Sequence, residues 1–267
     1  MRASLLESLK KLRLSGLAGS LEVRLAEATS SRLSHAEFLE LIVQDELAVR
    51  KDRLISRRTN AASFRDQKTL EDFDWTFNTS INRREIFDLA AGDFVRKAHD
   101  VLLVGPPGVG KSHLAQGIGL ALIKSGYTVL YRSIFDAVRD LLHDEAFEGH
   151  EKVMQSYLKP DLLILDDMGM KQLPKRSGEY LFEIIMRRHE LRSTMMTSNR
   201  PLEDWGKVIG DVPAATAILD RFLQDAALVQ ITGKSYRLRG KSAQEETVKS
   251  KTGQTRSPGK RKEKAAK

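Results

Sequence analysis

Apolar side chains recur at two different spacings along this chain of 267 residues, and the change of spacing divides it into two parts. Up to about residue 58, leucines recur every three or four positions among basic and polar residues, which predicts amphipathic helices. From Lys68 onward, short apolar runs alternate with helical patterns, as in a parallel sheet covered by helices on both faces. We therefore predict a small all-helical domain over residues 1–58, a linker over 59–67 and an α/β domain over 68–240.

The amino-terminal part contains signals for two helices. The first carries five leucines at roughly helical spacing: Leu5, Leu6, Leu9, Leu12 and Leu17. Ser34 and Glu37 form a capping box that starts the second. Its far end carries five basic residues: Arg50, Lys51, Arg53, Arg57 and Arg58. Cations there complement the helix dipole, but a dense basic cluster on a small helical module is also typical of a surface that contacts DNA.

Five apolar runs in the second part have the length of buried strands. They are Val101–Val104, Thr128–Arg132, Leu162–Leu165, Thr194–Thr197 and Leu228–Ile231. Amphipathic helices are predicted between them, notably over Ser112–Ser125 and Gly178–Leu191. Five parallel strands with intervening helices are enough for an open, doubly wound sheet, so the predicted fold class is α/β.

The segment Gly105–Ser112 has the G-x-x-x-x-G-K-S spacing of a phosphate-binding loop, directly after the first predicted strand. Glycines let backbone N–H groups curl around a phosphate. Lys111 offers a charge to the β- and γ-oxygens, the Ser112 hydroxyl can ligate Mg²⁺, and the following helix adds its N-terminal dipole. We expect a nucleoside triphosphate to bind nine consecutive residues: Gly105, Pro106, Pro107, Gly108, Val109, Gly110, Lys111, Ser112 and His113.

Two carboxylates, Asp166 and Asp167, follow the apolar run Leu162–Leu165. Ligands bind at the carboxyl ends of the strands in open α/β sheets, so Asp166 is predicted to reach Mg²⁺, mostly through water. Asp167 is then the base or orienting group for an attacking water. The alternative interpretation of two aspartates after a strand is a turn with a helix cap.

Two further residues are candidates for a hydrolytic site. Asn199 follows the fourth predicted strand, where its amide can hydrogen-bond the γ-phosphate or the water. Arg221 lies on a predicted amphipathic helix and is either the salt-bridge partner of a nearby aspartate or an arginine finger for a neighbouring subunit's γ-phosphate. Upstream of the first strand, Phe73 and Trp75 either pack on the adenine or staple the core.

Charge and composition narrow the class of protein. The net charge of +8 indicates a polyanionic partner. Much of the excess lies in residues 241–267, which hold nine basic and three acidic side chains and few apolar ones. We expect a disordered tail that either solubilises the chain or binds nucleic acid phosphates without sequence preference. Without cysteine, a long apolar run or an apolar signal core, the chain is expected to be cytoplasmic and to have no membrane partner.

With these motifs in this order, the chain resembles the AAA+ ATPases of the DnaA and DnaC branch. It is most similar to the IstB-like helper ATPases that are encoded beside a transposase in insertion sequences. The resemblance covers roughly residues 1–240 and is carried by five segments: Leu70–Asp74, Val101–Ala115, Leu163–Asp167, Thr197–Asn199 and Ile218–Phe222. The phosphate loop is generic, whereas its combination with Leu219–Phe222 and a core that ends soon afterwards is more specific.

The resemblance implies a P-loop AAA+ core that binds and hydrolyses ATP with Mg²⁺, forms a homo-oligomer on double-stranded DNA and assists a partner transposase in target selection. It also implies that Asn199 is the sensor and Arg221 the finger that acts on a neighbouring subunit. A DnaC-type helicase loader is the main alternative, and a small-molecule kinase with the same loop is a third. Only Gly233–Gly240 precede the tail, which leaves no room for a complete helical lid; Arg237 is the candidate for the lid's phosphate-contacting cation.

Overall fold

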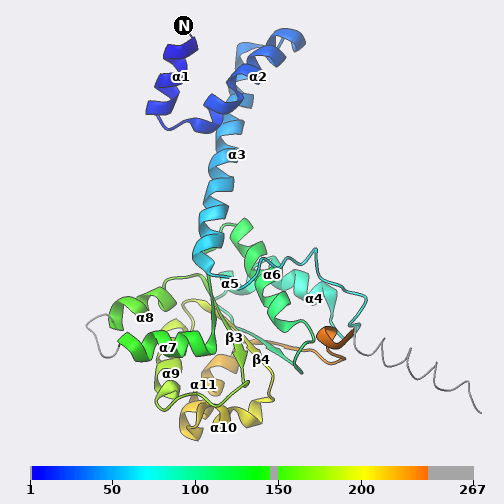
Figure 1. Cartoon of the computed structure of the whole chain (residues 1–267), viewed down its shortest axis with the longest axis vertical. Helices are drawn as coiled ribbons and strands as arrows, with labels where there is room; N and C mark the ends of the chain where they lie inside the picture. Colours follow the sequence, from blue (N-terminus) through cyan, green and yellow to red (C-terminus); the bar gives the residue numbers. More distant parts are fainter. Residues whose placement is uncertain (1, 145–149, 240–267) are drawn as a thin grey trace, which may run out of the picture.

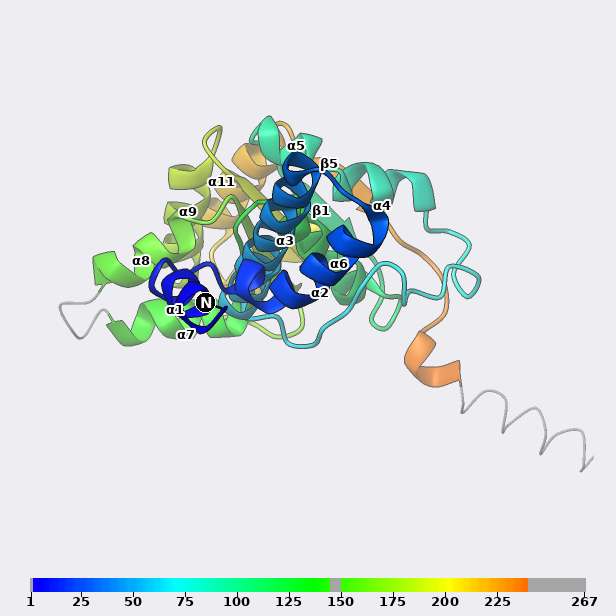
Figure 2. The ribbon, with the colours of Figure 1, turned by 90° about the horizontal axis from the view of Figure 1, so that it is seen from above.

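The computed structural model describes residues 2–144 and 150–239, in which a helical stalk rises from an α/β domain (Figure 1). Three helices form the stalk: α1 (Arg2–Lys11), α2 (Ser15–Ser31) and α3 (His35–Ala62). A small apolar cluster around Leu9, Leu21 and Ile42 holds their outer ends together. Seen from above, α3 stands over the α/β domain (Figure 2). The predicted basic tail at 241–267 lies outside the described residues.

The start of α3 is as predicted, but the first helix is not. Ser34 accepts the Glu37 N–H, and Glu37 accepts the Ser34 N–H, so the capping box is complete. The expected single helix through Leu17 is wrong, because the chain turns at Arg13, whose φ is +57°, and begins α2 at Ser15. A contact from the Glu46 side chain, which is distant in the sequence, supports this break.

α3 is longer than the sequence pattern suggests. It continues to Ala62 and ends at Ser63, which adopts a left-handed conformation with φ +57°. The first four residues of the predicted linker, 59–62, are therefore helical, since they contain neither glycine nor proline to end the helix. The division into domains at residues 58 and 68 remains an interpretation of the pattern.

The α/β domain contains the predicted five-stranded parallel sheet, in the order β2-β3-β4-β1-β5. The strands are β1 (Val101–Val104), β2 (Val129–Ser133), β3 (Leu162–Met168), β4 (Ser193–Ser198) and β5 (Ala227–Gln230). Each begins and ends within about three residues of its predicted run. Because all strands run the same way, their carboxyl ends meet at one edge, and the sites predicted there come together.

Helices cover both faces of the sheet, as in a doubly wound fold. Adjacent strand residues contribute to opposite layers: Leu103 belongs to one apolar cluster and Leu102 to the other. The first face is covered by α4 (Arg83–Ala90), α5 (Asp93–Arg96) and α6 (Lys111–Lys124). The second is covered by α7 (Ile134–Asp144), α8 (His150–Leu158), α9 (Ser177–Arg188), α10 (Trp205–Ile209) and α11 (Val212–Leu223).

Two short 3₁₀ turns, η1 (Leu202–Asp204) and η2 (Tyr236–Leu238), complete the described chain. The second of them brings the carboxyl-terminal end of the described chain back to the sheet edge where the phosphate loop lies. Within residues 2–144 and 150–239, no helix combines the length and the apolar character that crossing a membrane requires.

Candidate nucleotide-binding site

The predicted phosphate loop joins the end of β1 to the start of α6. Gly108 and Gly110 have φ angles of +82° and +107°, in the left-handed region where a side chain is strained. At Gly105, a Cβ atom would stand 2.0 Å from the carbonyl oxygen of Ile231, so the backbone passes too close to the end of β5 for any side chain. The loop thus takes a tight curve, and Lys111 begins the helix whose dipole attracts an anion.

The Lys111 ammonium lies inside this curve, in a residue that is only 5% exposed. Its Nζ donates to the carbonyl oxygens of Gly105 and Pro106 at 2.7 and 2.9 Å, and to Asn199 Oδ1 at 2.6 Å. Burial lowers the pKa of Lys111 to about 8, while two nearby carboxylates oppose that shift. The structure therefore places the predicted sensor amide in direct contact with the predicted phosphate-binding lysine.

Asp166 is fully buried and accepts hydrogen bonds from three elements. Ser112 Oγ at the start of α6 donates to Asp166 Oδ1 at 3.0 Å, and Thr197 Oγ1 on β4 donates to the same oxygen. The hydroxyl of Tyr131 on β2 donates to Oδ2. Burial and the Asp166 charge raise the pKa of Tyr131, so its hydroxyl stays protonated and remains a donor. The carboxylate is consequently held in one orientation.

The donor set at Ser112 and Asp166 fits Mg²⁺. Both groups supply hard oxygen ligands, and their 3.0 Å separation matches neighbouring corners of an octahedron with bonds of about 2.1 Å. In the described part of the chain, no three carboxylate, imidazole or thiol groups cluster closely enough to hold a metal ion. This pair therefore suits an ion that takes its remaining ligands from phosphate and water.

Asp167 faces the same edge but has different surroundings. Its N–H donates to Thr197 Oγ1 at 3.1 Å, and its φ of +66° is left-handed, which turns the side chain out of the strand. The register of β3 against β4 shifts between Leu165 and Met168 to accommodate this turn. Arg65 Nη1 lies 3.3 Å from Asp167 Oδ2. Burial and the neighbouring carboxylate raise the pKa of Asp167, and Arg65 acts in the opposite direction.

His113 and the upstream aromatic residues pack on one another. His113 Nε2 is 2.7 Å from the carbonyl oxygen of Thr69, and its ring meets Phe73 edge-on at 5.1 Å between centroids. Trp75 packs against Phe73 with tilted rings, 4.8 Å between centroids, and its indole N–H donates to the Leu70 carbonyl at 3.2 Å. Phe73 and Trp75 were expected either to pack on the adenine or to pack in the core, and these contacts favour packing in the core.

Arg221 is the one predicted catalytic residue that the fold does not bring to the phosphate loop. It lines a shallow pocket with Asp100, which precedes β1, and Asp225, which precedes β5. That pocket is at the amino edge of the sheet, opposite the loop. Arg221 is exposed, and the ion pair with Asp220 or Asp225 that was its alternative interpretation does not form among the described residues. Its guanidinium is thus available to another molecule.

Arg237 lies near the phosphate loop. The Tyr236 N–H donates to the Gly108 carbonyl at 2.9 Å, which docks η2 on the loop. The charge of Arg237 adds to the lowering of the Lys111 pKa and opposes the rise in the Asp167 pKa. Arg237 stays the candidate for the lid's phosphate-contacting cation, on a short turn instead of a helical lid.

Three contributors to the site were not identified from the sequence: Tyr131, Thr197 and Arg65. The end of the strand that contains Thr197 was recognised from the sequence, so its position just before Asn199 could have indicated that Thr197 lies at the site. In the sequence, Tyr131 looks like an ordinary core residue of β2. Arg65 lies in a segment interpreted as a linker, and its contact with Asp167 spans 102 residues, which no local pattern encodes.

Comparison with known proteins agrees with this geometry. The profile of the family described as IstB-like ATP binding protein matches residues 7–244. A protein of insertion sequence IS5376 from Geobacillus stearothermophilus, named for ATP binding, is 36% identical over 222 residues, covering 83% of this chain and 88% of that protein. Its counterpart in insertion sequence IS21 of Pseudomonas aeruginosa is 35% identical over 233 residues, covering 87% of this chain and 88% of that protein.

Solved structures share the fold. DnaA from Aquifex aeolicus, bound to AMPPCP, has a TM-score of 0.54 at 21% identity, and the match covers 69% of this chain and 56% of that one. A crystal structure of DnaI has a TM-score of 0.54 at 23% identity, covering 62% of this chain and 92% of that one. The α/β domain therefore has the AAA+ P-loop fold predicted from the sequence.

Proposed function

This chain belongs to the IstB-like ATP-binding proteins, and we propose that it hydrolyses ATP while assembled on duplex DNA and assists a transposase in selecting its target. The observation that carries the proposal is the convergence of Lys111, Ser112, Asp166, Asp167 and Asn199 at one sheet edge. The relatives named for insertion sequences support transposition as the process served.

Each group at the sheet edge has a task in hydrolysis. Lys111 would exchange its carbonyl partners for the β- and γ-oxygens of ATP. Ser112 and Asp166 would hold Mg²⁺, which when bound neutralises charge that develops on the transferred phosphoryl group. Asp167 would orient the attacking water and accept its proton, and Asn199 would hydrogen-bond the γ-phosphate. One chain would thus supply each of these groups for hydrolysis, but not a cation on the far side of the γ-phosphate.

We assign that missing cation to Arg221 of a neighbouring subunit. Arg221 is exposed at the amino edge of the sheet, whereas the phosphate loop is at the carboxyl edge, so it cannot serve its own chain's nucleotide. Subunits stacked head to tail would bring these two edges together. Hydrolysis would then depend on assembly, since the arginine stabilises charge only across the interface.

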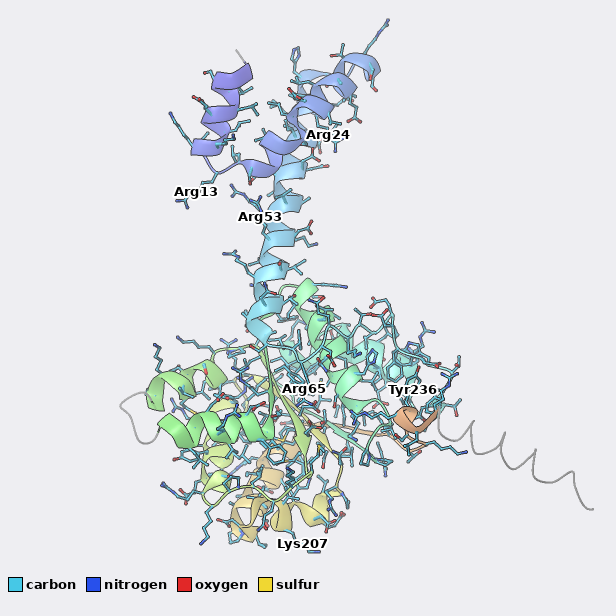
Figure 3. The ribbon with its side chains drawn as sticks, in the orientation of Figure 1. Arg13, Arg24, Arg53, Arg65, Lys207 and Tyr236 are labelled. Carbon is cyan, nitrogen blue, oxygen red and sulfur yellow. The ribbon has the colours of Figure 1, made fainter. Side chains whose placement is uncertain are left out.

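Basic residues at the stalk are our candidates for the DNA contact. Arg13 and Arg53 lie close to the turn between α1 and α2 (Figure 3). Arg50 donates to the Arg13 carbonyl at 3.5 Å and Arg53 donates to Ser15 Oγ, which gathers cations from two elements on one surface. Phosphate contacts of this kind bind any sequence and weaken as salt rises.

The DnaC-type loader remains the runner-up. DnaI shares the fold at 23% identity, a level of likeness that carries no information on the client. Three relatives that are 32–36% identical to this chain over most of both sequences are named for insertion sequences, so we favour a transposase as the partner. A direct comparison is to ask whether the protein on DNA stimulates strand transfer by the element's transposase or the loading of a replicative helicase.

ATPase measurements on the full chain, with and without duplex DNA, test the central claim. We expect DNA to raise turnover and to increase particle size, with both effects lost as salt rises. Lys111→Ala should weaken ATP binding by about a hundredfold or more, because hydrogen bonds to charged groups contribute about 1.5–3 kcal/mol each. ATP affinity unchanged in that variant, or turnover indifferent to DNA, would contradict the proposal.

A further inference from the structure

Three consecutive residues at the foot of α3 contact three different parts of the nucleotide site. The ring of Phe64 lies 6.0 Å from the ring of Tyr131 on β2. Arg65 Nη1 lies 3.3 Å from Asp167 Oδ2 at the end of β3. The Asp66 N–H donates to the Gln116 side chain on α6 at 3.1 Å. We call residues 64–66 the connector; Arg65 lies where the stalk meets the sheet (Figure 3).

Two partners of the connector, Tyr131 and Gln116, also contact residues that would bind Mg²⁺. The Tyr131 hydroxyl donates to Asp166, the predicted metal ligand. Gln116 donates to the carbonyl oxygen of Ser112, which follows the phosphate-binding lysine. A displacement of the connector would consequently reach both the metal ligands and the water-orienting carboxylate.

The contact of Arg65 with Asp167 is the most direct of the three. The main chain of Asp167 is fixed by the hydrogen bond to Thr197, so the direction of its carboxylate depends on side-chain partners. Arg65 approaches the carboxylate at Oδ2. The Asp167 side chain is 19% exposed and faces the sheet edge, as a water-orienting group must.

We propose that Arg65 is a positioning residue that aims Asp167 at the attacking water and thereby ties hydrolysis to the stalk. The inference rests on the ATPase activity proposed above. Only Ser63 and Phe64 separate Arg65 from the end of α3, and two of the candidate DNA-binding cations, Arg50 and Arg53, lie on that same helix. Arg58 donates to the carbonyl of Gly126, so the foot of α3 is also held at a second point on the domain. DNA bound to the stalk would act on Asp167 through this short path.

Steady-state ATPase of full-length Arg65→Ala and Arg65→Lys tests the assignment. Because misplacing a reacting group by about 1 Å can cost a hundredfold, we expect Arg65→Ala to lower kcat by about tenfold or more. KM for ATP should stay within about twofold, since Arg65 acts on the water and not on ground-state binding. Stimulation by duplex DNA should fall with kcat, and Arg65→Lys should restore part of both.

Matched control variants distinguish the positioning of Asp167 from a general loss of folding or of nucleotide binding. Lys68→Ala removes an exposed cation from the same segment and should behave as wild type. Arg65 is exposed, and exposed ion pairs contribute little to stability, so Arg65→Ala should fold and bind a fluorescent ATP analogue normally. In an Asp167→Asn background, Arg65→Ala should have no further effect on the residual turnover.

The outcomes distinguish the two proposals. Wild-type protein that hydrolyses nothing on DNA would overturn the proposed function and this inference with it. Wild-type turnover with an Arg65→Ala variant that matches it in kcat and DNA stimulation would overturn the inference alone. A raised KM at unchanged kcat would do the same, because it would make Arg65 a nucleotide-binding residue instead.

Discussion

At the residue scale, two adjacent carboxylates at the end of β3 have opposite surroundings. Asp166 is fully buried, and hydroxyl donors from three elements fix it. Asp167 turns out of the strand and accepts a hydrogen bond from the exposed Arg65. A fixed carboxylate suits a metal ligand, which must keep its geometry, whereas an adjustable one suits a group that activates water only on demand. The order of these two residues therefore divides the chemistry between them.

A prediction for a single residue concerns Asp100, which is not one of the two carboxylates at the end of β3. It is 8% exposed, and Thr194 N–H donates to its Oδ1 at 2.6 Å. Burial raises the pKa of Asp100 to about 7, Asp225 adds to the rise, and the Thr194 hydrogen bond and the Arg188 charge oppose it. Between its ordinary value of 3.8 and about 7, the folded state binds the proton more tightly, so the free energy of unfolding falls as pH rises.

Asp100→Asn removes this titration while its amide oxygen can still accept from Thr194. We expect the stability of the variant relative to wild type to increase from pH 5 to pH 8, by a few kcal/mol at roughly 1.4 kcal/mol per pKa unit. Urea denaturation across that range measures it. The exposed Asp93→Asn is the control, and its curve should run parallel to that of wild type. A parallel curve for Asp100→Asn would contradict the prediction.

Sequence spacing located the residues that follow from a local pattern. Lys111 and Ser112 come from a contiguous motif, and Asp166 and Asp167 come from a polar pair after an apolar run. Tyr131 and Arg65 could not be found this way, because their partners lie 35 and 102 residues away along the chain. The roles of the Tyr131 hydroxyl and the Arg65 guanidinium arise from these tertiary contacts.

At the element scale, the packing of α2 on α3 depends on one glycine. The Gly16 and Leu17 N–H groups at the start of α2 donate to the Glu46 carboxylate at 2.7 and 3.0 Å, so a side chain of α3 caps α2. A Cβ atom at Gly16 would stand 2.9 Å from the Cα of Glu46 and from Val49 Cβ. This cap explains why α1 and α2 are separate, a break that the leucine spacing alone did not reveal.

Gly16 and Gly19 form a matched pair on α2. Gly16→Ala should destabilise the packing of α2 on α3 by about 1–3 kcal/mol, the usual effect of overfilling a packed contact. At Gly19 an added Cβ would meet no heavy atom within 4 Å, so Gly19→Ala should be neutral or gain up to about 1 kcal/mol of helix propensity. Hydrogen exchange of the α2 amides measures both effects, and equal protection in the two variants would contradict the prediction.

The elements of the α/β domain were predictable for a physical reason. Strands buried on both faces are continuous apolar runs, and β1 and β3 have this pattern. Shorter apolar runs also located β2, β4 and the partly exposed β5. The extension of β3 to Met168 was missed, because the two aspartates interrupt the apolar pattern while the ladder continues beyond them with a shifted register. The end of α3 was missed because no residue near Arg58 breaks a helix.

At the scale of the whole molecule, the two halves of the proposed hydrolytic site occupy opposite edges of one sheet. The phosphate loop and Asp167 are at the carboxyl edge, and Arg221 is exposed at the amino edge. In the proposed function, one chain alone would not close such a site, but a head-to-tail row of chains would close one at every interface. The stalk projects away from the α/β domain (Figure 1).

This arrangement predicts complementation between two inactive proteins. Arg221→Ala keeps Asp167 but lacks the finger, and Asp167→Ala keeps the finger but lacks the water-orienting group. Each alone should bind ATP and fail to hydrolyse it on DNA. In an equal mixture, about one interface in four pairs an intact Asp167 with an intact Arg221 of its neighbour, so turnover should recover to at most about a quarter of wild type.

A second mixture decides whether recovery comes from a shared interface. Lys111 and Asp167 belong to the same chain's site, since Lys111 bonds Asn199 beside the ends of β1 and β4. Mixing Lys111→Ala with Asp167→Ala therefore assembles no complete site and should give no turnover. Recovery in both mixtures would indicate subunit effects unrelated to the finger, and recovery in neither would place Arg221 outside the reaction. Recovery in the first mixture alone requires that the ATP bound to one chain be hydrolysed with the help of the next.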